Sequence, residues 1–229
     1  MEYQIRLTQP AFHWIDIELA ACLKLLSKTI AGVLLLMLLG GPALGQESRP
    51  PVNVKGTTDI ELLGGGAFGW PFGAIQTGPG GTYDAWLAGA RIGRILTDAH
   101  GPGFLRGSMQ YSFGVFPVFV FTAPRSVYGG GFDAFVLRWN FSGGRRLAPY
   151  AEISGGAEVT TQDIPEPNTS RFNFTAKYIM GVQKPVGKRS AVDLSVGFWH
   201  LSNANLGNHN PSLNGVQFMV GYHWYKPGR

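Results

Sequence analysis

The sequence predicts an all-β fold: an eight-stranded antiparallel transmembrane β-barrel preceded by a cleaved signal peptide. Three observations lead to this prediction. The chain after the leader divides into eight strand-length segments, several of which alternate apolar and polar residues. The connections between them alternate between short and long, and the N-terminus carries an export-type apolar run. The composition agrees, because charged residues make up only 14% while the chain holds 33 glycines and 13% aromatic residues.

The N-terminal segment has the features of a secretory signal. Lys24 and Lys28 precede the apolar run 30–39, and the small-x-small sequence 43–45 offers a cleavage site. An apolar run of about ten residues is too short for a transmembrane helix. We therefore expect three parts: a signal peptide with an extended n-region over 1–45, a flexible lead-in over 46–58, and a barrel over 59–229.

Charge and cysteine content restrict the classes of function. Cleavage would remove Cys22, the single cysteine, so the exported chain has neither disulfides nor thiol chemistry. The formal net charge of +5 is mild and fits an anionic lipid surface. No basic run interleaved with aromatic residues is present, which argues against nucleic-acid binding.

The strands follow in order after the lead-in, and no segment has a sustained helical period. They are predicted over 59–70, 83–96, 104–115, 127–141, 149–161, 171–184, 190–202 and 214–225. Three segments alternate with particular clarity. The expected outward rows are Leu105, Met109, Tyr111, Phe113 and Val115 in the third segment, Ala151, Ile153, Ala157 and Val159 in the fifth, and Phe172, Phe174, Tyr178, Met180 and Val182 in the sixth.

The connections predict an outer-membrane topology with a periplasmic N-terminus. The second, fourth and sixth connections between strands are short, at 97–103, 142–148 and 185–189. The first, third, fifth and seventh are longer, at 71–82, 116–126, 162–170 and 203–213. The apolar stretch 116–122, FPVFVFT, allows two interpretations. It is either an outer loop that dips into lipid beside the site or an extension of the third strand.

Eight strands leave an interior that side chains can fill. The expected inward positions carry both signs of charge: Arg91, Arg106, Arg138 and Lys177 against Glu61, Glu152, Glu158 and Asp193. Burial without partners would be costly. We therefore expect a mutually paired internal network rather than a pore lining or an active site.

The candidate active site lies at the end of the seventh segment. His200 and Ser202 are two residues apart, so they point to one face about 6.6 Å apart along the strand. That face continues the apolar row from Val192 to Phe198, and Asn214 begins the corresponding row after the loop. A hydroxyl beside an imidazole is the minimal equipment for nucleophilic acyl transfer. Its place on an apolar face predicts a lipid substrate.

The sequence HLSNA at 200–204, followed by Asn210 and Pro211, resembles the active-site signature of the PagL-type lipid A 3-O-deacylase (acyloxyacyl hydrolase) outer-membrane family. The resemblance implies an eight-stranded barrel with its active site on the outer surface within the bilayer. His200 would be the general base and Ser202 the nucleophile. Backbone N–H groups near Ala204 and Asn205 are oxyanion-hole candidates. Asn203, Asn210 and His209 would shape the loop.

Two positions depart from the family pattern. The family has glycine at the position of Asn205 and glutamate at the position of Asn214. An amide oxygen can fix the imidazole tautomer, but it stabilises the imidazolium less than a carboxylate does. Asn214 can equally be a turn residue, because it precedes Gly215. His100 and His223 lie at other ends or faces of the barrel, so no metal set forms with His200. Neither a metal nor a cofactor is expected.

The predicted function is that of a serine esterase that removes an ester-linked acyl chain from lipid A of lipopolysaccharide in the outer membrane of a Gram-negative-type bacterium. Two alternatives come from other classes. One is a catalytically degenerate barrel of the same family with a structural or lipopolysaccharide-binding role. The other is a small solute or adhesion barrel in which 200–207 is only a loop. The sequence leaves open whether two barrels pair as a homodimer.

Overall fold

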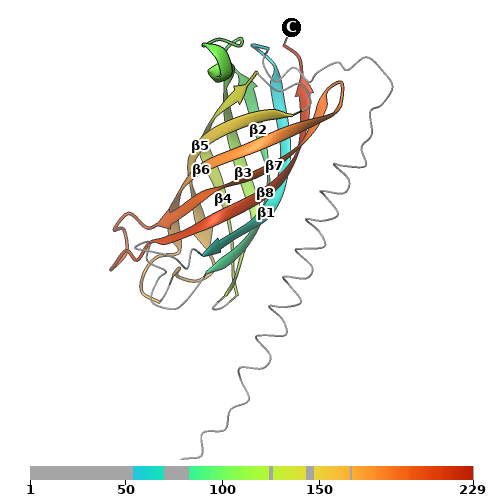
Figure 1. The fold of residues 1–229 in the computed structure, drawn as a ribbon. Coiled ribbons are helices and arrows are strands. Elements are labelled where there is room, and N and C mark those ends of the chain that lie inside the picture. Colours follow the sequence, from blue (N-terminus) through green and yellow to red (C-terminus); the bar gives the residue numbers. More distant parts are fainter. Residues whose placement is uncertain (1–53, 70–82, 124–125, 143–146, 166, 229) are drawn as a thin grey trace, which may run out of the picture. The chain divides into compact units, whose positions relative to one another are not determined.

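A computed structural model describes residues 54–69, 83–123, 126–142, 147–165 and 167–228. Eight antiparallel strands form a closed barrel in which each strand pairs with the next and β8 pairs with β1 (Figure 1). The strands are β1 (Thr58–Gly69), β2 (Asp84–Ile95), β3 (Gly107–Ala123), β4 (Val127–Phe141), β5 (Ala148–Thr160), β6 (Phe172–Gly187), β7 (Ser190–Ser202) and β8 (Leu213–Lys226). Closure leaves no unpaired strand edge. We call the end at which β1, β3, β5 and β7 finish the Ser202 end.

The predicted closed antiparallel barrel and its strand order are therefore confirmed. The expected signal peptide over 1–45, most of the lead-in and the connection 71–82 lie outside the described residues. Among the residues that the structure describes, no helix is long and apolar enough to cross a membrane.

The start of β3 differs from the prediction. Residues 103–105 form η1 (Gly103–Leu105), a single 3₁₀ turn, and the strand begins only at Gly107. Gly101 and Gly103 both adopt positive φ, at 96° and 49°, so the backbone turns where the sequence pattern suggests a strand. Arg106 is consequently exposed beyond the strand, and its predicted inward position is wrong.

The end of β3 decides between the two interpretations of 116–122. The stretch continues the strand, so a loop that dips into lipid is wrong. A register shift between Phe116 and Phe119 turns both rings inward, as a β-bulge does. Phe119 and Phe121 contact the buried Trp199 of β7, with ring centroids 6.3 Å apart in each pair. An apolar cluster therefore fills the interior at the Ser202 end.

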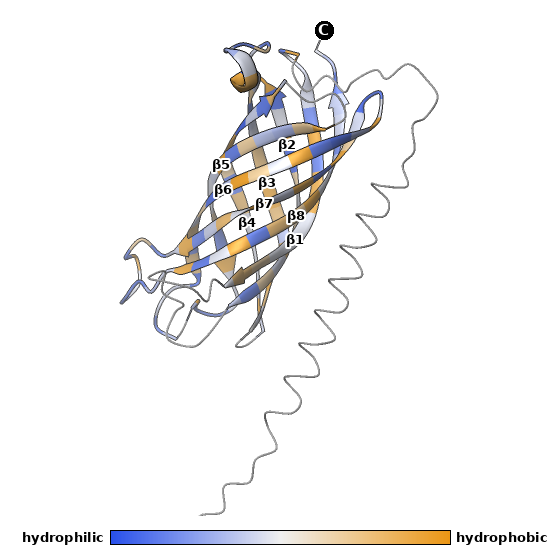
Figure 2. Cartoon of the chain, in the orientation of Figure 1, coloured by the Kyte–Doolittle hydropathy of each residue, from blue (hydrophilic) through white to orange (hydrophobic). Residues whose placement is uncertain are grey.

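Hydrophobic and hydrophilic residues alternate along the strands (Figure 2), and their exposure differs accordingly. The apolar side chains expected to point outward are exposed: Phe174, Tyr178, Val196, Phe218 and Val220. Glu152, Glu158 and Lys177 are buried in the interior. This arrangement inverts that of a soluble barrel, whose apolar row would face inward.

Arginine and carboxylate side chains form a paired network inside the barrel. The ion pairs join Arg91 to Asp133 at 2.9 Å and to Glu152 at 3.1 Å, Arg138 to Glu152 at 2.8 Å and to Glu61 at 3.3 Å, and Lys177 to Asp133 at 2.6 Å. The predicted mutual pairing is confirmed for these residues. Each of these buried charges gains a partner that offsets part of its desolvation. Glu158, which was also expected in the network, has no ion pair or hydrogen bond among the described residues.

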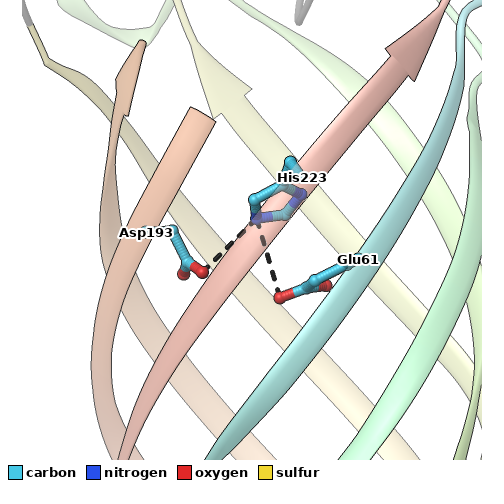
Figure 3. Close-up of side chains that lie close together, drawn as sticks. All are labelled: Glu61, Asp193 and His223. Atoms are coloured by element: carbon cyan, nitrogen blue, oxygen red, sulfur yellow. Dashed lines mark ion pairs between the residues drawn. The ribbon is translucent and has the colours of Figure 1, made fainter. Parts of the chain in front are cut away.

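His223 extends this network toward the other end of the barrel. Its Nδ1 lies 3.0 Å from Asp59, and its Nε2 lies 3.3 Å from Asp193 and 3.7 Å from Glu61 (Figure 3). Asp193 also accepts a hydrogen bond from Tyr150. Both ring nitrogens face carboxylates, an arrangement that suits an imidazolium donating from each side.

Candidate active site

The hairpin formed by β7 and β8 brings the predicted site residues together. Its register places His200 directly opposite Asn214, and Ser202 ends β7 two residues beyond His200. Side chains alternate along a strand, so His200 and Ser202 share the outward face. Trp199 and Leu201, which flank His200 and point inward, are fully buried. The inner packing thereby fixes the strand that carries the polar pair.

The three side chains form a continuous hydrogen-bonded series. His200 Nδ1 lies 2.7 Å from Asn214 Oδ1, and His200 Nε2 lies 3.2 Å from Ser202 Oγ. An amide oxygen only accepts hydrogen bonds, so Nδ1 carries the proton. The lone pair of Nε2 is then directed at the serine hydroxyl. All three side chains are half-buried, which leaves Ser202 within reach of an external substrate.

Asn203 organises the loop that follows. Its backbone N–H donates to Asn210 Oδ1 at 2.9 Å, and its side-chain Nδ2 donates to the His209 carbonyl at 2.8 Å. Its own Oδ1 accepts from the Asn205 N–H at 2.9 Å. Asn203 is almost completely buried. Asn203 and Asn210 therefore close the loop from both sides, in keeping with the loop-shaping role expected of them.

The turn after Ser202 uses an unusual backbone conformation. Ala204 and Asn205 adopt positive φ of 50° and 62°. Asparagine tolerates this region, which accounts for Asn205 in place of glycine, whereas the left-handed conformation costs an alanine about 1–2 kcal/mol. The Asn205 N–H is occupied by Asn203, but the Ala204 N–H makes no hydrogen bond within the described residues. Of the two predicted donors, Ala204 is the one available to an anion.

A second loop supports this turn, and sequence reasoning did not find it. A Cβ atom at Gly207 would lie 2.0 Å from the Thr169 carbonyl oxygen and 2.9 Å from Asn203 Nδ2. Thr169 is itself anchored through its hydroxyl to the carbonyl of the buried Ile164, at 2.9 Å. The loop between β5 and β6 thus packs against the loop that follows Ser202. The one sequence signal was an isolated glycine in a polar loop.

Replacing Gly207 with valine is expected to loosen the loop 203–212 while the barrel stays closed. The added side chain must displace either the Thr169 carbonyl or the Asn203 amide, because both lie inside van der Waals contact. Amide hydrogen exchange in 203–212 should accelerate by about tenfold or more. Asn208→Val, at an exposed neighbouring position, is the matched control. Equal exchange in the two variants would contradict this packing role.

An apolar groove of about 540 Å³ runs over the outer surface of β4, β5 and β6. It is lined by the large side chains of Phe132, Phe135, Ile153, Phe174 and Tyr178 and by the small residues Gly155, Ala157 and Ala176. The strand register connects the groove to the site. Ala176 pairs with His200 and with Gly155, while Phe174 pairs with Ser202 and with Ala157. The groove therefore begins beside the His200–Ser202 pair.

Comparison with known proteins identifies a family to which the sequence is similar. The model of the family described as lipid A 3-O-deacylase (PagL) matches residues 75–223, which include His200, Ser202 and Asn214. No curated protein matches the chain. Similar solved structures include the outer membrane enzyme PagL, with 15% identity and a TM-score of 0.48, covering 71% of this chain and 97% of that one.

Two further structures are the N-terminal β-barrel domain of Pseudomonas aeruginosa OprF and Neisserial surface protein A (NspA). The first has 14% identity, a TM-score of 0.46 and coverage of 75% of this chain and 98% of its own. The second has 12% identity, a TM-score of 0.44 and coverage of 73% and 96%. The family match spans well over half of the sequence, and the chain therefore belongs to the lipid A 3-O-deacylase (PagL) family.

Proposed function

We propose that this chain is an outer-membrane serine esterase that removes an ester-linked acyl chain from lipid A. One observation carries the proposal: the hydrogen-bonded series Asn214–His200–Ser202 on the apolar outer face of the barrel. A nucleophile, a base and a group that orients the base are the parts that acyl transfer requires. Family membership supports lipid A as the substrate.

The proposed mechanism follows from the His200 tautomer that carries its proton on Nδ1. His200 Nε2 takes the proton from Ser202 Oγ, which attacks the acyl carbonyl carbon and forms a tetrahedral intermediate. The Ala204 N–H lies just after the nucleophile and would donate to the developing oxyanion. The imidazolium then returns its proton to the leaving sugar oxygen, and an acyl-enzyme remains. Water, activated by His200 in the same way, releases the fatty acid and restores Ser202.

Asn214 orients the His200 base but does little to stabilise the positive charge that His200 acquires during attack. Its amide oxygen holds the Nδ1–H at 2.7 Å, so Nε2 faces Ser202 in the ground state. A carboxylate at this position would also stabilise the imidazolium that forms during attack, whereas a neutral amide does so only weakly. We infer a working but slow esterase.

The groove on β4–β6 would hold the acyl chain that is cleaved. The small residues that line it leave space at the barrel surface, and its aromatic side chains offer apolar contact to a chain that enters from the membrane. The groove reaches His200 through Ala176, so the scissile ester at its mouth would lie next to Ser202.

Ala176→Phe is expected to reduce kcat/KM for long-chain esters by about tenfold or more, with a smaller loss for short-chain esters, because the ring fills the groove beside His200. Rates should be measured on a series of ester substrates that differ only in acyl length. Ala88→Phe, on the exposed outer face of β2, is the matched control and should have no effect. A uniform loss at every chain length would argue against acyl binding in the groove.

We further propose that the barrel spans the outer membrane after export and cleavage of a signal peptide over 1–45, with 46–58 as lead-in and 59–229 as the barrel domain. The apolar outer surface supports this placement, since a continuous exposed apolar band would be unfavourable in water. The Ser202 end would then lie at the outer leaflet, where lipopolysaccharide is found.

A catalytically degenerate lipopolysaccharide-binding barrel is the second candidate, and Asn214 is the observation that favours it. The two candidates predict different results for purified barrel mixed with lipid A in detergent. An esterase releases fatty acid with time in proportion to enzyme. A degenerate barrel binds lipid A and releases none, and that result would overturn the proposal of catalysis.

A further inference from the structure

The buried interior of the barrel holds more carboxylates than cations. The buried acids among the described residues are Asp59, Glu61, Asp133, Glu152, Glu158 and Asp193, and the buried bases are Arg91, Arg138, Lys177 and His223. Even with His223 as an imidazolium, the acids outnumber the bases by two. An uncompensated charge in a low-dielectric interior is strongly unfavourable. Some further positive charge, a proton or a cation, is therefore required.

Among the described residues, Glu158 is the buried acid that makes no ion pair and accepts no hydrogen bond. The other five buried carboxylates each contact an arginine, a lysine or His223. Both Glu158 oxygens, in contrast, are buried and accept no hydrogen bond from any described residue. Lys177 is close enough to act on Glu158 electrostatically, but its ion pair, at 2.6 Å, is with Asp133. One of the two excess negative charges therefore lies at Glu158, two residues before the end of β5.

Two more unpartnered oxygens lie beside Glu158. Asn173 is its direct cross-strand neighbour on β6, and Thr175 is the next inward residue of that strand. Asn173 Oδ1 and Thr175 Oγ1 are buried and have no hydrogen-bond partner within the described chain. The Asn173 amide nitrogen donates to the Ser170 carbonyl at 3.2 Å, so the oxygen is the atom left free. On the other side, Gly131 of β4 pairs with Glu158 and brings no side chain.

We propose that Glu158, Asn173 and Thr175 form a binding site for a hard divalent cation of the Ca²⁺ type inside the barrel. A carboxylate, an amide oxygen and a hydroxyl form an all-oxygen donor set, which such cations prefer over nitrogen or sulfur. Asn173 faces Glu158 directly across the antiparallel strands, where Cβ atoms lie about 4.5–5.5 Å apart, and Thr175 is a diagonal neighbour, where the separation is about 7–8 Å. Both spacings allow side chains to share one ion. A double positive charge would balance the interior.

The cluster of Glu61, Asp193 and His223 is the weaker candidate for a metal (Figure 3). Its carboxylates already form ion pairs, Glu61 with Arg138 and Asp193 with His223, and Asp193 also accepts a hydrogen bond from Tyr150. An imidazolium at His223 accounts for its short contacts to Asp59 and Asp193. No such pairing accounts for the buried carboxylate of Glu158.

The cation site would lie behind the outer groove. Thr175 points inward between Phe174 and Ala176, the two residues that pair with Ser202 and His200. A bound ion would therefore join β5 and β6 at the level of the polar pair and stabilise the barrel there. This inference does not depend on the barrel being an enzyme.

The test is Ca²⁺ binding by the intact barrel, purified without lipopolysaccharide in a non-ionic detergent and stripped with chelator. Equilibrium dialysis followed by elemental analysis should find about one Ca²⁺ per chain. Addition of Ca²⁺ should raise the unfolding temperature by several degrees, since a ligand that binds only the folded state stabilises it. Glu158→Gln should abolish both effects, and Thr175→Val should weaken the affinity by about tenfold.

Asp163→Asn, which removes a partly exposed loop carboxylate, is the control and should bind Ca²⁺ as the wild type does. Thr175→Val is the test variant to use if Glu158→Gln does not fold, because it keeps the shape of the side chain and every interior charge. Absence of Ca²⁺ binding in the wild type, or binding unaffected by both interior variants, would overturn the proposal. Glu158 would in that case carry a proton instead.

Discussion

Replacing Ser202 with alanine is expected to reduce lipid A ester hydrolysis to the uncatalysed background. The hydroxyl at 3.2 Å from His200 Nε2 is the only atom in the series positioned to attack a carbonyl. Removal of the nucleophile from a serine hydrolase typically costs about 10⁶-fold in kcat. Because we infer that Asn214 makes the wild type slow, we expect the measured loss to be limited by the detection floor. The loss is measured as the rate of fatty-acid release when purified barrel is mixed with lipid A.

Ser195→Ala is the matched control for this variant. Ser195 lies on the same strand with the opposite parity, so the chemical change is the same but the outer face is untouched. It should retain full activity. If Ser202→Ala retained activity in a folded barrel, the nucleophile would have to be assigned to another group.

Asn214→Glu is expected to raise kcat by about 10²-fold or more. Asn214 pairs directly with His200, so a carboxylate there can accept the Nδ1–H and stabilise the imidazolium in the transition state. In serine proteases the reverse change, aspartate to asparagine, costs about 10⁴-fold, although it also disturbs the tautomer. The gain should be smaller here because the amide oxygen already fixes the tautomer. Initial rates at saturating substrate measure the change.

Asn214→Ala separates the two roles of this side chain. It removes the acceptor for Nδ1–H without adding charge, so the correct tautomer is no longer favoured and activity should fall below that of the wild type. If Asn214→Ala and Asn214→Glu both matched the wild type, Asn214 would be a turn residue with no part in the chemistry.

Most of the fold could be predicted because one physical rule dominates it. A barrel with an apolar exterior and a polar interior imposes a period of two on every strand, and clear rows such as Tyr111, Phe113 and Val115 follow that rule. The rule fails in β3 at both ends. Near Arg106 two glycines with positive φ start a turn, and near Phe119 a bulge shifts the parity of an all-apolar stretch. Neither event changes the hydrophobic pattern enough to be seen in one sequence.

In the site too, the contacts within one hairpin could be predicted, whereas the contacts between distant segments could not. The closeness of His200, Ser202 and Asn214 follows from strand periodicity and from a hairpin whose register the loop fixes. The contact between Gly207 and Thr169 joins two separate loops and leaves no periodic signal. The unpartnered oxygens around Glu158 could not be predicted either. A sequence shows that an inward side chain is charged, but not whether a neighbouring side chain comes close enough to pair with it.

Mass spectrometry of lipid A from cells that express the chain is the most direct test of the central claim, which is that His200 and Ser202 form a working lipid A esterase. Wild-type barrel, inserted in the outer membrane, should produce a lipid A species lighter by one ester-linked acyl chain, and Ser202→Ala at the same expression level should not. A larger yield is expected from Asn214→Glu. Identical lipid A in all three strains, with each barrel correctly folded, would contradict the claim.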